Sequence, residues 1–205
     1  MYKTEQEQFW STDFGNEYIK RNTYEDLYPG LLYFWSKIIS KTSAVKSCIE
    51  FGANIGVNLR AIKTLVPDME IAAIEINHMA CQDYLKKFLS PENIYEQSIL
   101  DYEPKRKYDL AFIKTVLIHI NPDELQNAYE KLYNSSNKYI LVAEYYNQTP
   151  VMIEYRGNKE RLFKRDFAGE ILDKYPDLKL VDYGFFYNRD NNFKMDDISW
   201  FLMEK

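Results

Sequence analysis

The stretch EFGANIGVN, residues 50–58, decides the fold of this chain. It follows the short apolar run SCIEF (47–51) and leads into a helical pattern of apolar residues over 58–66. Gly52 and Gly56 let the backbone turn tightly and approach a ligand without a Cβ in the way. We therefore expect a buried strand, a ligand-binding turn and a helix in direct succession.

The spacing of these glycines disfavours two nucleotide-binding motifs. The dinucleotide signature G-x-G-x-x-G is not met, because Asn54 takes the place of its middle glycine. No Walker lysine follows, which disfavours a triphosphate cradle. A turn that joins strand and helix without any ligand is the alternative for this motif taken alone.

The same pattern of strand and helix repeats along the chain. Strands are predicted at 70–76, 94–97, 108–115 and 138–145, and helices at 31–40, 77–89, 122–133 and 165–174. Such alternation is typical of a parallel sheet covered on both faces. Two last strands, 179–187 and 197–204, are too close in sequence for a parallel crossover, so we expect them to pair antiparallel. Residues 149–164 show weak periodicity and are predicted to be an irregular insertion.

Composition limits the class of protein. A length of 205 residues fits one domain. The net charge of −5 disfavours binding to duplex nucleic acid, which is itself strongly negative. We expect no transmembrane helix and no secretory signal, because there is no long apolar run and the first residues are polar and acidic. Cys48 and Cys81 lack metal-ligand spacing, so we predict no metal site and a cytoplasmic protein with reduced thiols.

Polar residues follow several predicted strands, at the edge where parallel sheets bind ligands. Glu75 ends the second strand, 23 residues after Gly52. An acid at this place accepts hydrogen bonds from ribose hydroxyls in doubly wound folds. The segments 97–101 and 114–115 follow the third and fourth strands. Glu75 and these two segments all lie at the carboxyl ends of predicted parallel strands. This shared position, more than any single residue, predicts a nucleotide-like ligand.

At these motifs the chain resembles class I S-adenosylmethionine (SAM)-dependent methyltransferases. The matching segments are EFGANIGVN, AAIEIN, QSILD and YDLAFIKTVLIHINP, and the closing hairpin resembles the reversed seventh strand of that fold. The resemblance implies a Rossmann-like α/β fold, with a doubly wound, mostly parallel seven-stranded sheet and helices on both faces. It also implies SAM as cofactor and methyl transfer to a small molecule as the activity.

A narrower resemblance spans nearly the whole chain. FWSTDFGNEYIKRN, KTVLIHINPDEL, AEYYNQTPVMIEYRG, LFKRDFAGEILDKYPDLKLVDYGF and DISWFLMEK are similar to the pseudaminic acid biosynthesis-associated methylases. This implies a nonulosonic, pseudaminic-type sugar or its precursor, an anionic small molecule, as acceptor. Ala53 and Asn54 depart from the small residues or glycine that many methyltransferases have there, which narrows the methionine end of the pocket.

The resemblance implies roles for a set of cofactor-binding residues. Gly52, Ala53 and Gly56 would line the methionyl and ribose part, with Glu50 or Asn54 near the amino group. Glu75 and Asn77 would bind the ribose, Ser98, Ile99 and Leu100 the adenine, and Lys114 and Thr115 would lie beneath the methyl donor. Tyr18 and Arg21, with Phe14, would close over the cofactor, Arg21 meeting the methionine carboxylate. Asn58 and Ile76 complete the predicted set.

The acceptor side is predicted from the segments after the fourth and fifth strands. His119 is the candidate base, and a satisfied structural histidine in the apolar run VLIHI is the alternative. The predicted substrate-binding residues are Tyr145, Tyr146, Asn147, Tyr155, Arg156 and Lys164. The basic residues between 156 and 165 fit an anionic group or, alternatively, a solvated face. We expect a single domain over 1–205, with a helical cap at 1–40 and an acceptor-side insertion at 146–165.

Three other functions stay open on sequence grounds. A SAM-using enzyme can transfer or cyclise the aminocarboxypropyl group in place of the methyl group. A SAM-binding domain without catalysis is the second alternative, and a nicotinamide-binding protein, which the missing third glycine disfavours, is the third. The acceptor, the methylated atom and the oligomeric state are left open.

Overall fold

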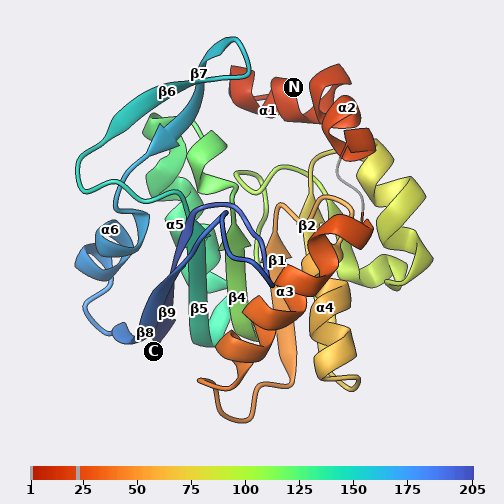
Figure 1. Cartoon of the computed structure of the whole chain (residues 1–205), viewed down its shortest axis with the longest axis vertical. Coiled ribbons are helices and arrows are strands. Elements are labelled where there is room, and N and C mark those ends of the chain that lie inside the picture. The colour runs from red at the N-terminus through yellow and green to blue at the C-terminus, as the bar shows by residue number, and fades with distance from the viewer. Residues whose placement is uncertain (1, 22–23) are drawn as a thin grey trace.

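A seven-stranded sheet forms the centre of the molecule (Figure 1). The computed structural model describes residues 2–21 and 24–205, and the side chains of these residues apart from 24–27 and 159. The strand order is β3-β2-β1-β4-β5-β9-β8. The strands are β1 (Ser47–Phe51), β2 (Glu70–Glu75), β3 (Ile94–Glu96), β4 (Tyr108–Lys114), β5 (Ser136–Glu144), β8 (Lys179–Phe186) and β9 (Ile198–Glu204). The first five are parallel, and β9 is antiparallel to both β5 and β8.

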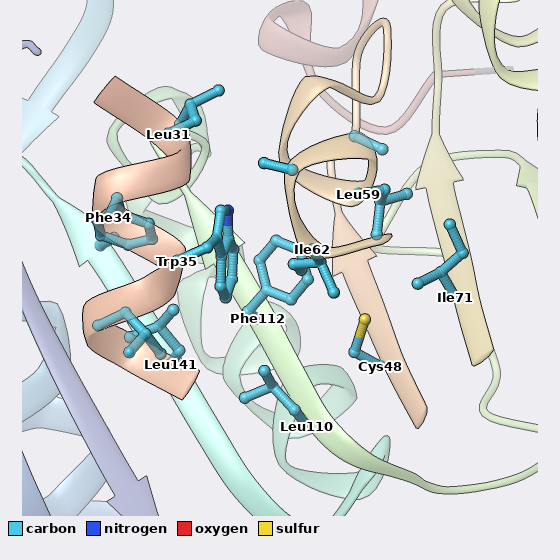
Figure 2. Close-up of a cluster of buried hydrophobic side chains, with 14 of the residues drawn as sticks. Leu31, Phe34, Trp35, Cys48, Leu59, Ile62, Ile71, Leu110, Phe112 and Leu141 are labelled. Atoms are coloured by element: carbon cyan, nitrogen blue, oxygen red, sulfur yellow. The ribbon is translucent and has the colours of Figure 1, made fainter. Parts of the chain in front are cut away.

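Helices cover both faces of this sheet, as predicted. One face carries α3 (Tyr24–Ile39) and α4 (Val57–Leu65), and the other carries α5 (Leu125–Asn134) and α6 (Phe167–Lys174). Each face buries its own apolar cluster. In the first cluster Trp35 of α3 packs edge-on against Phe112 of β4, with ring centroids 4.6 Å apart (Figure 2). The doubly wound, mostly parallel architecture with an antiparallel end is therefore confirmed.

The segment predicted as a helix over 77–89 is less regular than its apolar period suggests. Asn77 caps the start of the segment, because its Oδ1 accepts the amide N–H of Ala80 at 3.0 Å. The chain then forms a π-helical turn, Ala80–Tyr84, and a 3₁₀ turn, Leu85–Lys87. An apolar period near 3.6 does not distinguish an α turn from a single wider turn.

The prediction of an irregular insertion at 149–164 is wrong. These residues form a second, two-stranded sheet, β6 (Val151–Tyr155) and β7 (Asn158–Lys164). Arg156 and Gly157 make its tight turn, with φ values of 50° and 79°. Val151, Met152 and Ile153 are all exposed, so β6 lacks the alternation that identifies a half-buried strand.

The N-terminal segment forms α1 (Glu5–Ser11) and α2 (Asp13–Arg21), and these helices lie over the carboxyl ends of the parallel strands (Figure 1). The predicted helical cap 1–40 includes positions 1, 22 and 23, which lie outside the described residues. Among helices of the described residues, none has the length and apolar composition that a membrane span requires.

Candidate active site

The turn between β1 and α4 is built from left-handed residues, as its glycines predict. Gly52, Asn54 and Gly56 have φ values of 76°, 49° and 76°. The amides of Gly52 and Ala53 both donate to the carbonyl of Ile74, at 2.9 and 3.0 Å, which joins the turn to β2. A Cβ on Gly52 would lie 2.6 Å from Cγ2 of Val116, and one on Gly56 would meet Leu85 and Phe88 as closely. Both positions therefore require glycine.

Glu75 connects this turn to the end of β2. Its Oε2 accepts the amide N–H of Asn54 at 2.6 Å, and its Oε1 accepts the amide N–H of Asn77 at 2.8 Å. Burial raises the pKa of this carboxyl, while the backbone hydrogen bonds oppose the rise. Each carboxylate oxygen has a second lone pair. Glu75 can accept further hydrogen bonds from a ligand's hydroxyl groups.

Glu50, at the end of β1, keeps one unsatisfied oxygen. Asn58 donates to its Oε1 at 2.6 Å, and Trp35 Nε1 donates to Asn58 Oδ1 at 3.1 Å. Glu50 Oε2 is buried and has no hydrogen-bond partner among the described residues. Burial raises the pKa of Glu50 well above its ordinary value. Asn58 therefore orients Glu50 and has its own oxygen occupied by Trp35. The unpaired Oε2 of Glu50 is suited to binding a cation.

Lys114 ends β4 beside these acids. Its side chain is half-buried, and within the described residues its ammonium has neither a hydrogen bond nor an ion pair. Burial lowers the pKa of Lys114, and the carboxylates of Asp196, Glu50 and Glu144 oppose that shift. A cation without a partner at this edge suits a ligand carboxylate. Thr115, the next residue, adopts φ 55°, which turns the chain into the segment that contains His119.

Glu144, at the end of β5, belongs to the same edge and was not predicted. Its Oε1 accepts the amides of Val116 and Leu117 at 2.9 and 2.8 Å, which fixes the turn after β4. Its Oε2 is buried and lacks a partner among the described residues. Burial raises the pKa of Glu144 to about 7. The sequence feature that could have identified Glu144 is an acid at the end of an otherwise apolar strand, in ILVAEY.

His119 is buried and bonded to the backbone of β7. A carbonyl can only accept, so Nδ1 donates to the carbonyl of Arg161 at 2.6 Å and Nε2 is left as an acceptor. Burial lowers the pKa of His119 to about 4, so the ring is neutral near pH 7. The rings of Trp10 and Tyr155 lie 4.5 and 5.0 Å from it, centroid to centroid. Trp10 was not among the predicted site residues.

The N-terminal helices are tied to the carboxyl edge of the sheet by Asn77. Its Nδ2 donates to the carbonyl of Trp10 at 3.2 Å and to Oδ1 of Asn16 at 2.9 Å. The Trp10 ring also contacts Tyr18, 5.3 Å away. Arg21 lies at the end of α2 with Cζ 5.6 Å from the Phe14 ring.

The predicted adenine segment is a compact turn. Ser98 Oγ accepts the amide of Leu100 at 3.1 Å, and the carbonyl of Leu100 accepts from Lys3 and Asn127. Ser98, Ile99 and Leu100 are buried, and Ile76 is half-buried.

The predicted acceptor residues divide into two groups. Tyr145 is half-buried, with Lys164 Nζ 5.2 Å from its ring and the Asp196 carboxylate near its hydroxyl. Asp196 comes from the loop between β8 and β9, which sequence reasoning did not include. Tyr146 is exposed, Asn147 bonds locally to Thr149, and Arg156 lies at the exposed hairpin tip.

The basic cluster between 156 and 165 does not form one anion site. Arg161 pairs with Glu5 at 3.0 Å, and Arg165 pairs with Glu170 at 2.5 Å. Its remaining described cations, Arg156 and Lys164, lie against the rings of Tyr155 and Tyr145.

The strand order, the antiparallel last strands and the glycine turn after β1 define the class I methyltransferase fold. The similar solved structures include a SAM-dependent methyltransferase from Leishmania major, with 12% identity, a TM-score of 0.71 and coverage of 97% of this chain and 81% of that one. Another is magnesium protoporphyrin IX methyltransferase from Synechocystis with bound SAM, with 11% identity, a TM-score of 0.64 and coverage of 100% and 99%. A SAM-dependent methyltransferase from Clostridium acetobutylicum has 13% identity, a TM-score of 0.64 and coverage of 93% and 97%.

Neither a protein-family model nor a curated protein matches the sequence. The structural likeness therefore establishes the fold, and the activity is inferred from the site.

Proposed function

We propose that this protein is an S-adenosylmethionine-dependent methyltransferase that acts on a small molecule. One observation carries the proposal: an unsatisfied carboxylate oxygen and an unpaired ammonium flank the glycine turn. Glu50 Oε2 and Lys114 Nζ have the charges that complement the α-ammonium and α-carboxylate of a methionyl group. The residues present therefore fit SAM at the carboxyl ends of β1 and β4.

The remaining cofactor roles follow the same edge of the sheet. Glu75 has lone pairs available for ribose hydroxyls, since its two backbone bonds use only one on each oxygen. Ser98, Ile99 and Leu100 would bind the adenine beyond β3. The N-terminal helices, with Tyr18 and Arg21, would close over the cofactor and exclude water.

Methyl transfer needs a nucleophile held in line with an electrophilic methyl group, which the sulfonium of SAM supplies. The protein's part is to position the acceptor and to keep water out. His119 keeps Nε2 as an acceptor, and the rings of Trp10 and Tyr155 lie against its imidazole. If the methyl-accepting group carries a proton that must leave, His119 would receive it. The low pKa of His119 makes it a weak base.

For the acceptor we propose an anionic, pseudaminic-type sugar or its precursor. Lys164 beside Tyr145 and Arg156 beside Tyr155 are cations without ion pairs in the described residues. We assign 1–40 as a helical cap and 146–165 as the acceptor-side insertion of a single domain. A cytoplasmic location stays a prediction.

A thermal-shift measurement with S-adenosylhomocysteine (SAH), run beside NADH, tests the cofactor. At about a hundred times its Kd, a ligand stabilises the fold by roughly 2.7 kcal/mol. In a chain of this size that raises Tm by about 5–11 °C. The isosteric variant Glu50→Gln keeps the acceptor for Asn58 but removes the charge, so it should lose most of the shift. A shift with NADH alone would overturn the proposal.

A further inference from the structure

The strand β8 is an open edge of the main sheet (Figure 1). One side of it pairs with β9. In the described part of the chain, no backbone group of another element pairs with the outer side. Open edges are ready templates for a further strand, and proteins usually protect them with charges, prolines, bulges or short length.

The second half of β8 lacks these protections. A register shift at Val181 protects the first half, and the only charge after it, Asp182, is held by Lys41 at 3.2 Å and by the amide of Tyr183. The run YGFFY (183–187) has no charge and no proline. It is the part of the edge best suited to pairing.

Aromatic side chains line one face of this edge. Tyr183, Phe185 and Tyr187 are 65%, 56% and 50% exposed. They continue a strip that includes Phe201 of β9, whose ring lies 6.3 Å from that of Tyr183, and Tyr146, 6.1 Å from Phe201. Gly184 points to the opposite face, where a Cβ would lie 2.8 Å from the Trp200 ring.

We propose that β8 pairs antiparallel with β8 of a second copy of this chain, which joins two sheets across a two-fold axis. A two-fold axis perpendicular to the sheet keeps the aromatic strip on the same face in both copies. If a whole aromatic side chain presents about 200 Å², the three rings on β8 expose roughly 350 Å². That is nearly half of the ~800 Å² that each partner contributes to a standard interface, before the backbone edge is counted.

The charges at the two ends of β8 are partly complementary in this arrangement, since the loop 188–197 carries Asp190, Asp196 and Asp197 against Arg189 and Lys194. The strand begins with the exposed Lys179 and is followed by Asn188, which donates twice to the carboxylate of Asp197. Antiparallel pairing brings the beginning of one β8 to the end of the other. With Tyr183 at the two-fold axis, Lys179 of one copy faces Tyr187 of the second, next to Asn188 and Asp197, which favours a copy of this chain as the occupant.

Sedimentation of the full chain between ~1 and ~100 µM tests the proposal, since interfaces of this size reach micromolar affinity or better. We expect a dimer, and Phe185→Lys should raise its dissociation constant at least ~100-fold, because it places a like charge in the paired aromatic strip of each copy. Met152→Lys is the matched control: Met152 is 57% exposed but lies on β6, so dimerisation should not change. A monomer throughout the range, or a dimer that Phe185→Lys leaves intact, would overturn the proposal.

A cysteine scan gives a second test that does not depend on weakening the interface. At a two-fold axis a residue faces its own copy, with Cβ atoms roughly 5 Å apart. We expect Tyr183→Cys or Phe185→Cys to form an intermolecular disulfide under mild oxidation, and Met152→Cys to stay monomeric. The native thiols, Cys48 and Cys81, are buried and give no background. If neither β8 variant forms a disulfide, alone or mixed with the other, the strand does not pair with itself.

Discussion

Three carboxylates are buried at the carboxyl edge of the sheet: Glu50, Glu75 and Glu144. Glu75 is satisfied by two amides, whereas Glu50 and Glu144 each keep an oxygen without a partner among the described residues. An unsatisfied buried polar group costs about 1–3 kcal/mol. A stable fold retains such a cost where the group serves a ligand or fixes a strained turn. Glu50 fits the first role and Glu144 the second.

Lys114→Met should weaken SAH binding without weakening the binding of methylthioadenosine. If Lys114 holds the methionyl carboxylate, its removal costs a charge-assisted interaction of about 1.5–3 kcal/mol. This corresponds to a roughly 10- to 150-fold higher Kd for SAH. Methylthioadenosine lacks the aminocarboxypropyl group and should bind both proteins equally. Calorimetric titration of the two ligands gives the comparison.

The paired ligands also act as the control for misfolding. A variant that is merely damaged loses affinity for both ligands, so parallel losses would argue against a role for Lys114 at the carboxylate. Glu50→Gln should show the same selective loss through the ammonium.

Glu144 should make stability depend on pH with a definite sign. Its pKa is raised from 4.5 to about 7 in the folded protein, so the folded state binds more protons than the unfolded state between these values. The stabilisation is full below pH 4.5 and is lost as pH rises through 7. The difference in unfolding free energy, wild type minus Glu144→Gln, should therefore fall by about 2–3 kcal/mol between pH 5 and 8.

Urea unfolding at several pH values measures this difference. Glu50 and Glu75 titrate in both proteins, so the subtraction removes their contribution. His119, whose pKa is lowered to about 4, has the opposite sign and is likewise common to both. A difference that does not change with pH would show that Glu144 is ionised in the folded protein throughout.

At the scale of elements, the sequence predicts the parallel strands well because each is a short apolar run before a turn. The strand 47–51 and the turn glycines Gly52 and Gly56 occur as predicted. The hairpin β6–β7 was missed for a physical reason. Most of β6 is exposed and only Leu162 of β7 is fully buried, so the strands carry no clear apolar alternation, and only the Arg156-Gly157 turn marked the hairpin.

Gly52→Ala should destabilise the protein more than Gly157→Ala. The two glycines have almost the same backbone conformation, with φ values of 76° and 79°. An alanine at either position should therefore suffer the same left-handed strain of about 1–2 kcal/mol. They differ in surroundings: a Cβ on Gly52 meets Val116 at 2.6 Å, and one on Gly157 meets nothing within 4 Å. Overpacking should add about 1–3 kcal/mol at Gly52 alone.

Chemical denaturation of both variants gives this difference directly. Val116→Ala in the Gly52→Ala background removes the obstructing methyl groups and should recover part of the loss. Equal destabilisation of the two glycine variants would mean that strain, and not the close approach of Val116, explains Gly52.

At the scale of the whole molecule, the site joins segments that are far apart in sequence. Tyr145 contacts Lys164 of β7 and Asp196 of the last loop, and His119 lies against Trp10. Strand ends predicted the cofactor side, because parallel strands deliver their carboxyl ends to one edge. No local sequence pattern indicates which loops fold back to that edge. The positions of Asp196 and Trp10 could therefore not be predicted from the sequence.

The N-terminal helices should loosen when their contacts with Asn77 are broken. Asn77→Asp keeps the oxygen that caps Ala80 but loses the Nδ2 donor to Trp10 and Asn16. Two lost hydrogen bonds of about 1 kcal/mol each should raise the open population roughly 10- to 30-fold. Hydrogen exchange in α1 and α2 should accelerate by that factor while β1 and β2 exchange as before. Faster exchange in the strands as well would mean that Asn77 supports the whole edge of the sheet, and unchanged exchange in the helices would mean that aromatic packing alone holds them.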